Sequence, residues 1–248
     1  PSAVDVQKAL REDQNITHVC IVHCETTTGI INPIAEIGEI VKGNGMTYIV
    51  DAMSSFGAVT VDIKDIGIDF LISSSNKCIE GVPGFSFIIV SNEALRNCRE
   101  QSRTLSLDLY DQWESMEYTG QFRFTPPVQV LLAFRQALRE LESEGGVTGR
   151  GQRYRENHKT LVEGMKEMGF HTYISDELQG HIITTFLIPE DNAFEFDSFY
   201  ADLNSKGFVI YPGKLTKINS FRIGSIGQLY KKDIEALLKA ISEIVGVI

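Results

Sequence analysis

The feature that most constrains the fold is the alternation of short apolar runs with a helical pattern in the first 90 residues. Four runs have the length and composition of buried strands: residues 16–23, 46–50, 69–73 and 85–90. Between the first two runs, apolar residues recur at helical spacing from Ile34 to Val41, which predicts a helix. Because strands that alternate with helices are joined by crossovers, the sequence predicts an α/β fold with a mostly parallel sheet.

Two long helices are predicted in the middle of the chain. Thr125 is a good N-cap residue and the Pro126-Pro127 pair suits a first helical turn, so one helix should run from there to Glu144. A second helix is predicted over residues 149–168. The residues that precede both, 102–124, have no regular pattern and are predicted to be irregular.

The C-terminal part has the pattern of a compact α+β unit. Strands are expected at residues 181–188, 208–211 and 221–223, and helices at residues 195–206 and 231–245. The glycine-rich stretch 145–151 is the predicted domain boundary. We therefore expect a large parallel-sheet domain, residues 1–148, and a smaller C-terminal α+β domain, residues 149–248.

Composition and charge argue against several classes of protein. The chain of 248 residues has 23 Lys and Arg against 33 Asp and Glu, a net charge of −10, which argues against a nucleic-acid groove. No apolar stretch approaches the ~20 residues of a membrane helix, so we expect no membrane association. The four cysteines lack the spacing of a disulfide-rich domain, which predicts reduced thiols and a cytoplasmic location.

Two residues with reactive side chains follow neighbouring predicted strands. Asp51 comes directly after the run 46–50, and Lys77 follows the run 69–73 after a polar turn. In open parallel sheets, ligands bind outside the carboxyl ends of the strands, so both side chains should face one crevice. Their spacing alone leaves open a catalytic pair, a structural ion pair, or two unrelated surface charges.

The residues around Lys77 favour the catalytic interpretation. Small and turn-forming residues flank it in the sequence SSSNKCIEGVPGF, and the glycines at 81 and 84 permit a close approach to a ligand. A lysine amine in a desolvated pocket can form a Schiff base with an aldehyde. A nearby buried carboxylate is the partner that a protonated pyridine nitrogen requires.

Residues 18–24 contain four side chains of metal-ligand type, those of His18, Cys20, His23 and Cys24. On a strand, His18, Cys20 and Cys24 face one side and His23 faces the other. A single strand cannot wrap four ligands tetrahedrally around one zinc ion. The sequence therefore predicts no metal site, and we interpret the cysteines as small hydrophobic residues.

Five blocks, in order along the chain, resemble the class V aminotransferases of pyridoxal phosphate. They are HCETTTGI (23–30), IVDAMSSFGA (49–58), SSSNKCIEGVPGF (73–85), FRFTPP (122–127) and FRIGSIG (221–227). The resemblance implies the aspartate-aminotransferase-like fold, which is pyridoxal-phosphate fold type I, with pyridoxal 5'-phosphate as the cofactor. The blocks are most similar to the branch that transfers the amino group of 2-aminoethylphosphonate to pyruvate, giving phosphonoacetaldehyde and alanine.

Carried over residue by residue, the resemblance implies how the cofactor is held. Lys77 would form the Schiff base with its aldehyde and move the proton in catalysis, and Asp51 would pair with the pyridinium nitrogen. Thr26 would hydrogen-bond near the ring hydroxyl, and Asn76, where relatives often have Gln, would make a polar contact. Thr125 would reach the cofactor phosphate of a neighbouring subunit, which implies a homodimer.

The resemblance also implies that Arg222 binds the acidic group of the small-molecule amino donor or keto acid, a role suited to a planar guanidinium. An arginine in a strand can also form a structural ion pair, and Thr125 can serve only as a helix cap. The choice of Thr26 within the run Thr26–Thr28 depends on the resemblance alone.

Other activities remain open at this point. The same class includes alanine–glyoxylate and serine–pyruvate aminotransferases, which share the core residues and differ in the acid-binding pocket. Relatives also carry an N-terminal segment with a glycine-rich phosphate loop and an aromatic residue that stacks on the pyridine, and neither precedes Asp51. We therefore expect a truncated large domain, and a folded fragment without catalytic activity is a further alternative.

Overall fold

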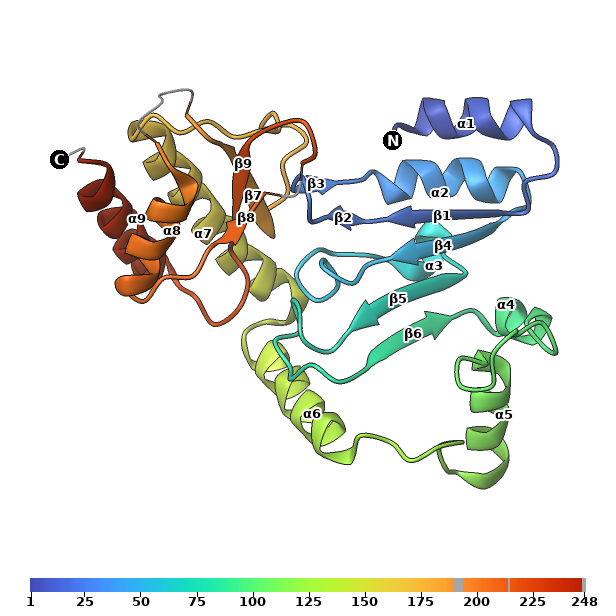
Figure 1. Cartoon of the computed structure of the whole chain (residues 1–248). Helices are drawn as coiled ribbons and strands as arrows, with labels where there is room; N and C mark the ends of the chain where they lie inside the picture. Colours follow the sequence, from blue (N-terminus) through green and yellow to red (C-terminus); the bar gives the residue numbers. More distant parts are fainter. Residues whose placement is uncertain (190–193, 214, 247–248) are drawn as a thin grey trace. The chain divides into compact units, whose positions relative to one another are not determined.

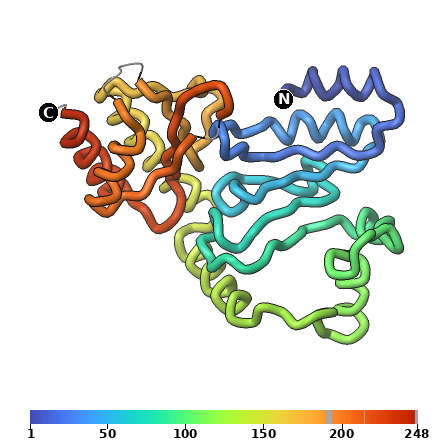
Figure 2. The backbone as a smooth tube through the Cα atoms, in the orientation of Figure 1, coloured from blue at the N-terminus to red at the C-terminus, as the bar shows by residue number. Residues whose placement is uncertain are grey.

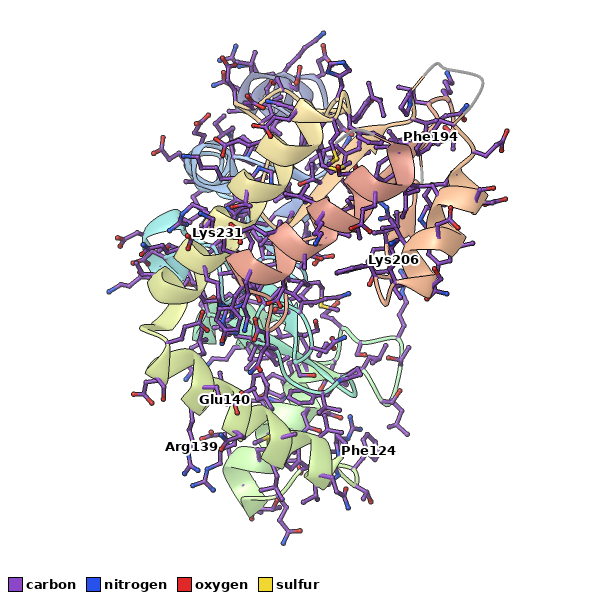
Figure 3. All side chains as sticks on the ribbon, turned by 90° about the vertical axis from the view of Figure 1, so that its left-hand side faces the viewer. Phe124, Arg139, Glu140, Phe194, Lys206 and Lys231 are labelled. Carbon is purple, nitrogen blue, oxygen red and sulfur yellow. The ribbon has the colours of Figure 1, made fainter. Side chains whose placement is uncertain are left out.

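The structure of the chain is a computed structural model that describes residues 1–189, 194–213 and 215–246 (Figure 1). It divides into two compact units: unit 1 contains residues 1–23, 33–53 and 61–139, and unit 2 contains residues 24–32, 54–60 and 140–248. Arg139 and Glu140, labelled in Figure 3, are neighbours in helix α6 (Val128–Ser143) at the last point of division. The domain boundary after residue 148 stays a prediction, because compactness alone does not establish independent folding.

Unit 1 is built on a four-stranded sheet in the order β1-β4-β5-β6. The strands are β1 (His18–Val22), β4 (Thr47–Asp51), β5 (Phe70–Ser74) and β6 (Ser86–Val90). The first three are parallel, and β6 runs antiparallel to β5. The prediction of a mostly parallel sheet in an α/β fold is therefore confirmed.

Helices connect and cover the strands of unit 1. They are α1 (Ala3–Glu12), α2 (Ile34–Gly43), α3 (Ile63–Ile66), α4 (Asn92–Asn97), α5 (Leu109–Thr119) and the first part of α6. Figure 2 shows the chain passing from β1 through α2 to β4, and from β4 through α3 to β5. Each of these paths is a crossover between parallel strands, as the alternating sequence pattern predicts.

The two faces of this sheet differ in burial. Tyr48, Val50 and Leu71 lie on one face and are fully buried, and the Tyr48 hydroxyl donates a hydrogen bond of 2.8 Å to the Ile34 carbonyl of α2. Their neighbours along the strands point to the opposite face, where Asp51 and Ile72 are only half-buried. Asp51 therefore lies on the more open face of the sheet.

Unit 2 pairs a three-stranded antiparallel sheet with helices. Its sheet has the order β7-β9-β8, with β7 (Ile183–Leu187), β8 (Tyr211–Pro212) and β9 (Ser220–Gly224). Its helices are α7 (Gly146–Glu167), α8 (Phe196–Ser205) and α9 (Lys231–Val245), and a small hairpin joins β2 (Cys24–Glu25) to β3 (Ile30–Ile31). Phe186 and Phe221 stack at 5.7 Å in the core between sheet and helices.

Two predictions of local secondary structure are wrong, one in unit 1 and one in unit 2. Residues 102–124, predicted to be irregular, contain α5, which has only Tyr110 buried and so lacks the apolar stripe that identifies a helix in sequence. The strand predicted at residues 208–211 forms only at Tyr211 and Pro212. Like the other described helices, α5 is not long and apolar enough to cross a membrane.

The predicted helix cap at Thr125 is also wrong. Helix α6 begins at Val128, and the Leu131 N–H donates to the Pro127 carbonyl, which makes Pro127 the first acceptor of the helix. Thr125 lies before this point and is exposed. Because α6 starts after Pro126 and Pro127, Thr125 does not occupy the N-cap position of this helix.

Gly38 and Gly43 of α2 test how tightly this helix packs. A Cβ atom at Gly38 would lie 2.6 Å from the Ile66 carbonyl oxygen, whereas a Cβ atom at Gly43 would have nothing within 4 Å in the part of the chain that the structure describes. We expect Gly38→Ala to lower the free energy of unfolding by about 1–3 kcal/mol through overpacking. Gly43→Ala should leave it unchanged or raise it by less than about 1 kcal/mol, because alanine favours helix. Urea unfolding followed by circular dichroism measures both, and equal effects would contradict close packing of α2 on α3.

Candidate active site

Asp51 is the last residue of β4, and two backbone contacts fix its position. Its Oδ1 accepts a hydrogen bond of 2.9 Å from the Met53 N–H, and its carbonyl accepts one of 2.8 Å from the His23 N–H. Among the described residues, no cation pairs with this carboxylate, so a structural ion pair between Asp51 and Lys77 is not seen. The carboxylate is thus held at the strand end and remains available to a ligand.

Lys77 lies in a loop that is closed by its own hydrogen bonds. The Gly81 N–H donates to the Ser75 carbonyl at 2.8 Å, and the Ser75 hydroxyl donates to the Val82 carbonyl at 2.7 Å. A Cβ atom at Gly81 would lie 2.6 Å from the Ser75 carbonyl oxygen, so this closure requires glycine. The Lys77 side chain is exposed and Asn76 is half-buried, so the described residues do not form the desolvated pocket expected around Lys77.

The pairing of β4 with β5 brings the two strand ends to the same edge of the sheet. Asp51 lies opposite Ile72, and the Ala52 N–H donates to the Ile72 carbonyl at 2.8 Å. The loop of Lys77 begins directly after Ser74, the last residue of β5. The predicted adjacency of the two strand ends is therefore present, and the shared crevice for the Asp51 and Lys77 side chains stays a prediction.

Ser74 is a candidate residue that sequence reasoning missed. It lies two positions beyond Ile72, on the same face of the sheet as Asp51, and it is 7% exposed. In the described part of the chain its Oγ has no hydrogen-bond partner. A buried hydroxyl without a partner is costly, so this atom is a candidate contact for a ligand. Three consecutive serines offered no signal to choose this one.

Arg222 is fixed inside unit 2 by carbonyl oxygens. It is 6% exposed in the centre of β9, its Nε donates to the Pro212 carbonyl at 3.1 Å, and its Nη1 donates to the Thr26 carbonyl at 2.9 Å. The Tyr211 ring lies 5.9 Å from the guanidinium carbon. Burial lowers the pKa of Arg222, and Tyr211 partly opposes this shift. No carboxylate of the described residues pairs with it, so the structural ion pair is not seen.

The segment around Thr26 is bound to the same sheet. The Thr185 hydroxyl donates to the Thr27 carbonyl at 3.1 Å, and the Gly180 N–H donates to the Gly29 carbonyl at 2.8 Å. Thr26 itself is half-buried. Unit 2 thus brings Thr26 and Arg222 together through the Thr26 backbone, which leaves the role of the Thr26 side chain a prediction.

Thr125 lies in an exposed connection between α5 and α6. In the residues that the structure describes, its side chain makes no hydrogen bond. Arg123 nearby fixes the connection through a 2.9 Å ion pair to Asp111 and a 2.9 Å hydrogen bond to the Leu105 carbonyl. Its assignment to the phosphate of a neighbouring subunit stays a prediction.

The residues of metal-ligand type in 18–24 form no cluster. His18 and Cys20 are exposed on β1, whereas His23 and Cys24 are buried. Within residues 1–189, 194–213 and 215–246, no group of three His, Cys, Asp or Glu side chains could hold a metal ion. Burial raises the pKa of Cys24 to about 12, so this thiol stays protonated.

Two half-buried histidines lie next to strand β7 of unit 2. The His158 ring contacts the Thr184 hydroxyl at 3.0 Å, and the Nε2 atom of His181 has no partner among the described residues. Burial lowers the pKa of His158 to about 4, and the neighbouring His181 contributes to this shift. Burial also lowers the pKa of His181.

These shifts predict how stability depends on pH. Between pH 6.5, the ordinary histidine value, and about 4, the unfolded chain binds protons that folded His158 excludes, so stability falls as the pH falls through this window. We expect His158→Gln to flatten that slope, whereas His171→Gln, at an exposed position of unit 2, should not. Urea unfolding at several pH values measures both slopes. An unchanged slope in His158→Gln would contradict the assignment of this pH dependence to His158.

Comparison with known proteins shows a clear relationship. The chain is 54% identical over 241 residues to a 2-aminoethylphosphonate–pyruvate transaminase of Lysinibacillus sphaericus, and 52% identical over 244 residues to one of Vibrio parahaemolyticus. These matches cover 97% and 98% of this chain and 66% of each relative. The chain therefore spans just under two thirds of the length of these relatives.

Solved structures show the same fold. A crystal structure of alanine–glyoxylate aminotransferase from Nostoc sp. matches 99% of the chain and 66% of its own chain, with a TM-score of 0.88 and 24% identity. Pyridoxamine–pyruvate aminotransferase from Mesorhizobium loti matches 99% of the chain and 64% of its own, with a TM-score of 0.87 and 26% identity. The expected type I fold of pyridoxal-phosphate enzymes is therefore confirmed. Residues 3–207 match the aminotransferase class V family, and the chain belongs to that family.

Proposed function

We propose that this protein transfers the amino group of 2-aminoethylphosphonate to pyruvate, giving phosphonoacetaldehyde and L-alanine. The observation that carries the proposal is the identity of 52–54% with relatives named for this reaction, over 96–98% of the chain. Asp51, Lys77 and Arg222 support it, because unit 1 holds the acid and the amine at one sheet edge and unit 2 holds a fixed guanidinium.

The residues of unit 1 fit pyridoxal phosphate, the cofactor of class V aminotransferases. The Lys77 amine is exposed, the Asp51 carboxylate has no cation partner among the described residues, and the Ser74 hydroxyl is buried without a hydrogen bond. An amine, a carboxylate and a hydroxyl are suited to an aldehyde, a protonated ring nitrogen and a polar substituent. The unpartnered Ser74 hydroxyl in particular is explained by a ligand.

When bound, pyridoxal phosphate supplies an aldehyde that takes up amino groups and a ring that accepts electrons. Asp51 would keep a proton on the ring nitrogen, because its carboxylate is anchored by the Met53 N–H. The Nζ atom of Lys77 would take the proton from the amino-bearing carbon of the donor and return a proton to the keto acid carbon. The closed loop from Ser75 to Val82 would hold that amine in position.

Arg222 would bind the acidic group of both substrates. Two of its five N–H groups are fixed by carbonyl oxygens, which leaves three to donate to an oxyanion. Because the side chain is already ordered, binding an acid costs little further entropy. The phosphonate of the donor and the carboxylate of pyruvate would be recognised in turn.

We include a homodimer in the proposal. Large apolar side chains are exposed in the stretch 105–125, which includes α5 and precedes α6: Leu105, Leu107 and Tyr118 are 70%, 75% and 91% exposed. Phe124, labelled in Figure 3, belongs to the same stretch and is also exposed. Several large exposed apolar side chains within one short stretch favour a protein interface. Thr125 would enter the neighbouring site from this stretch.

An experiment on Lys77 tests the proposal. Incubation with pyridoxal phosphate and then borohydride should leave a pyridoxyl group on the peptide that contains Lys77, and Lys77→Ala should lose both the label and transamination. Peptide mass spectrometry locates the label, and Lys64→Ala is the control because Lys64 lies in α3 of the same unit. A protein that takes up no label would favour a fragment without catalytic activity.

The donor assay then separates the alternative aminotransferases. With pyruvate or glyoxylate as acceptor, 2-aminoethylphosphonate should be preferred to alanine and serine as amino donor. Preferential alanine–glyoxylate or serine–pyruvate turnover would overturn the substrate assignment without affecting the assignment of Lys77.

Ser74→Ala tests whether the buried hydroxyl serves a ligand. Without cofactor, its removal should leave the unfolding free energy unchanged or raise it by about 1 kcal/mol, because an unpartnered buried hydroxyl is lost. Affinity for pyridoxal phosphate should fall about tenfold, since a hydrogen bond to a charged or polar group is lost. Equilibrium dialysis measures the affinity. The control Ser73→Ala removes a hydroxyl that already bonds to the Ala52 carbonyl at 3.3 Å, so it should lower stability instead.

A further inference from the structure

The surroundings of Arg222 in the sheet of unit 2 are asymmetric. Arg222 pairs with Thr185 of β7 and with Tyr211 of β8, so these three side chains share one face. The intervening residues of β9, Phe221 and Ile223, point to the other face and belong to the hydrophobic core. The face that carries Arg222 continues along β9 to Ser220 in one direction and to Gly224 in the other.

The Ser220 side of Arg222 is closed by packing. Ser220 is 7% exposed, and a Cβ atom at Gly213 of the adjacent connection would lie only 2.3 Å from the Ser220 Oγ. Glycine at 213 is therefore explained by the close approach of two chain segments. The chain is therefore tightly packed on this side of the guanidinium.

The Gly224 side of Arg222 is open. A Cβ atom at Gly224 would have no atom of the described residues within 4 Å, and Gly224 is half-exposed at the end of β9. Its φ is not positive, so the backbone accepts any ordinary residue here. Neither conformation nor packing explains glycine at this position, and what the glycine provides is empty space on the face of Arg222.

We propose that Gly224 is a specificity-determining residue that keeps room beside Arg222 for a tetrahedral, doubly charged phosphonate. The inference rests on the proposed function, because it assumes that Arg222 binds the acid group. A phosphonate has three oxygens around phosphorus and fills more space than a planar carboxylate with two. The three remaining N–H groups of Arg222 would donate to a phosphonate whose oxygens enter the space over Gly224.

The test is binding of two unreactive acids that differ only in the acid group, ethylphosphonate and propionate, measured by isothermal titration calorimetry on the full chain. We expect Gly224→Ala to weaken ethylphosphonate binding about tenfold and propionate binding less than about threefold, and Gly224→Val to weaken ethylphosphonate further. Gly43→Ala is the matched control, because a Cβ atom there also meets nothing within 4 Å but lies in α2 of unit 1.

Each outcome decides a specific point. Thermal unfolding of Gly224→Ala should match that of the unmodified chain, which separates a lost contact from a misfolded protein. Equal weakening of both acids, or no weakening, overturns the role of Gly224. If ethylphosphonate binding is lost in Arg222→Gln but unaffected in Gly224→Ala, only this inference fails. If the unmodified chain binds no ethylphosphonate, the acid-binding role of Arg222 fails with it.

Discussion

The parallel pairing of β4 with β5 is the constraint on which the site in unit 1 depends. The register sets Asp51 opposite Ile72, and this alone places an acid at the edge of the sheet where the loop of Lys77 begins. The register is in turn fixed by burial, because the fully buried Val50 and Leu71 share the face of Tyr48, which contacts α2, while the half-buried Asp51 faces away. A slip of one residue would bury the carboxylate in the core.

In unit 2, backbone carbonyls hold the candidate arginine in place, whereas in unit 1 the strand register positions the candidate acid. Arg222 is buried without a carboxylate partner among the described residues, which is tolerable because the Pro212 and Thr26 carbonyls accept two of its hydrogen bonds. This leaves the positive charge formally uncompensated. A site of this kind favours an anionic ligand over a structural ion pair, and it supports the acid-binding role that the family resemblance implies.

The sequence predicted what depends on local pattern and missed what depends on contacts between distant segments. Apolar runs that end in polar residues located the sheet, Asp51 and Lys77, because strand ends and loops have composition of their own. Helix α5 was missed because a largely exposed helix has no apolar stripe, and the cap at Thr125 was wrong because the prolines delay the helix. The contact of Arg222 with Thr26 joins residues 196 positions apart, and the lone hydroxyl of Ser74 depends on its neighbours in space.

The course of the chain between the units has a consequence for dissecting the protein. Residues 24–32 and 54–60 belong to unit 2 although they lie far ahead of its main part, residues 140–248. A recombinant piece that starts at residue 149 would therefore lack the carbonyls of Thr26 and Thr27, which hold Arg222 and Thr185. The smaller unit is a composite of three stretches of sequence, so no single cut yields it whole.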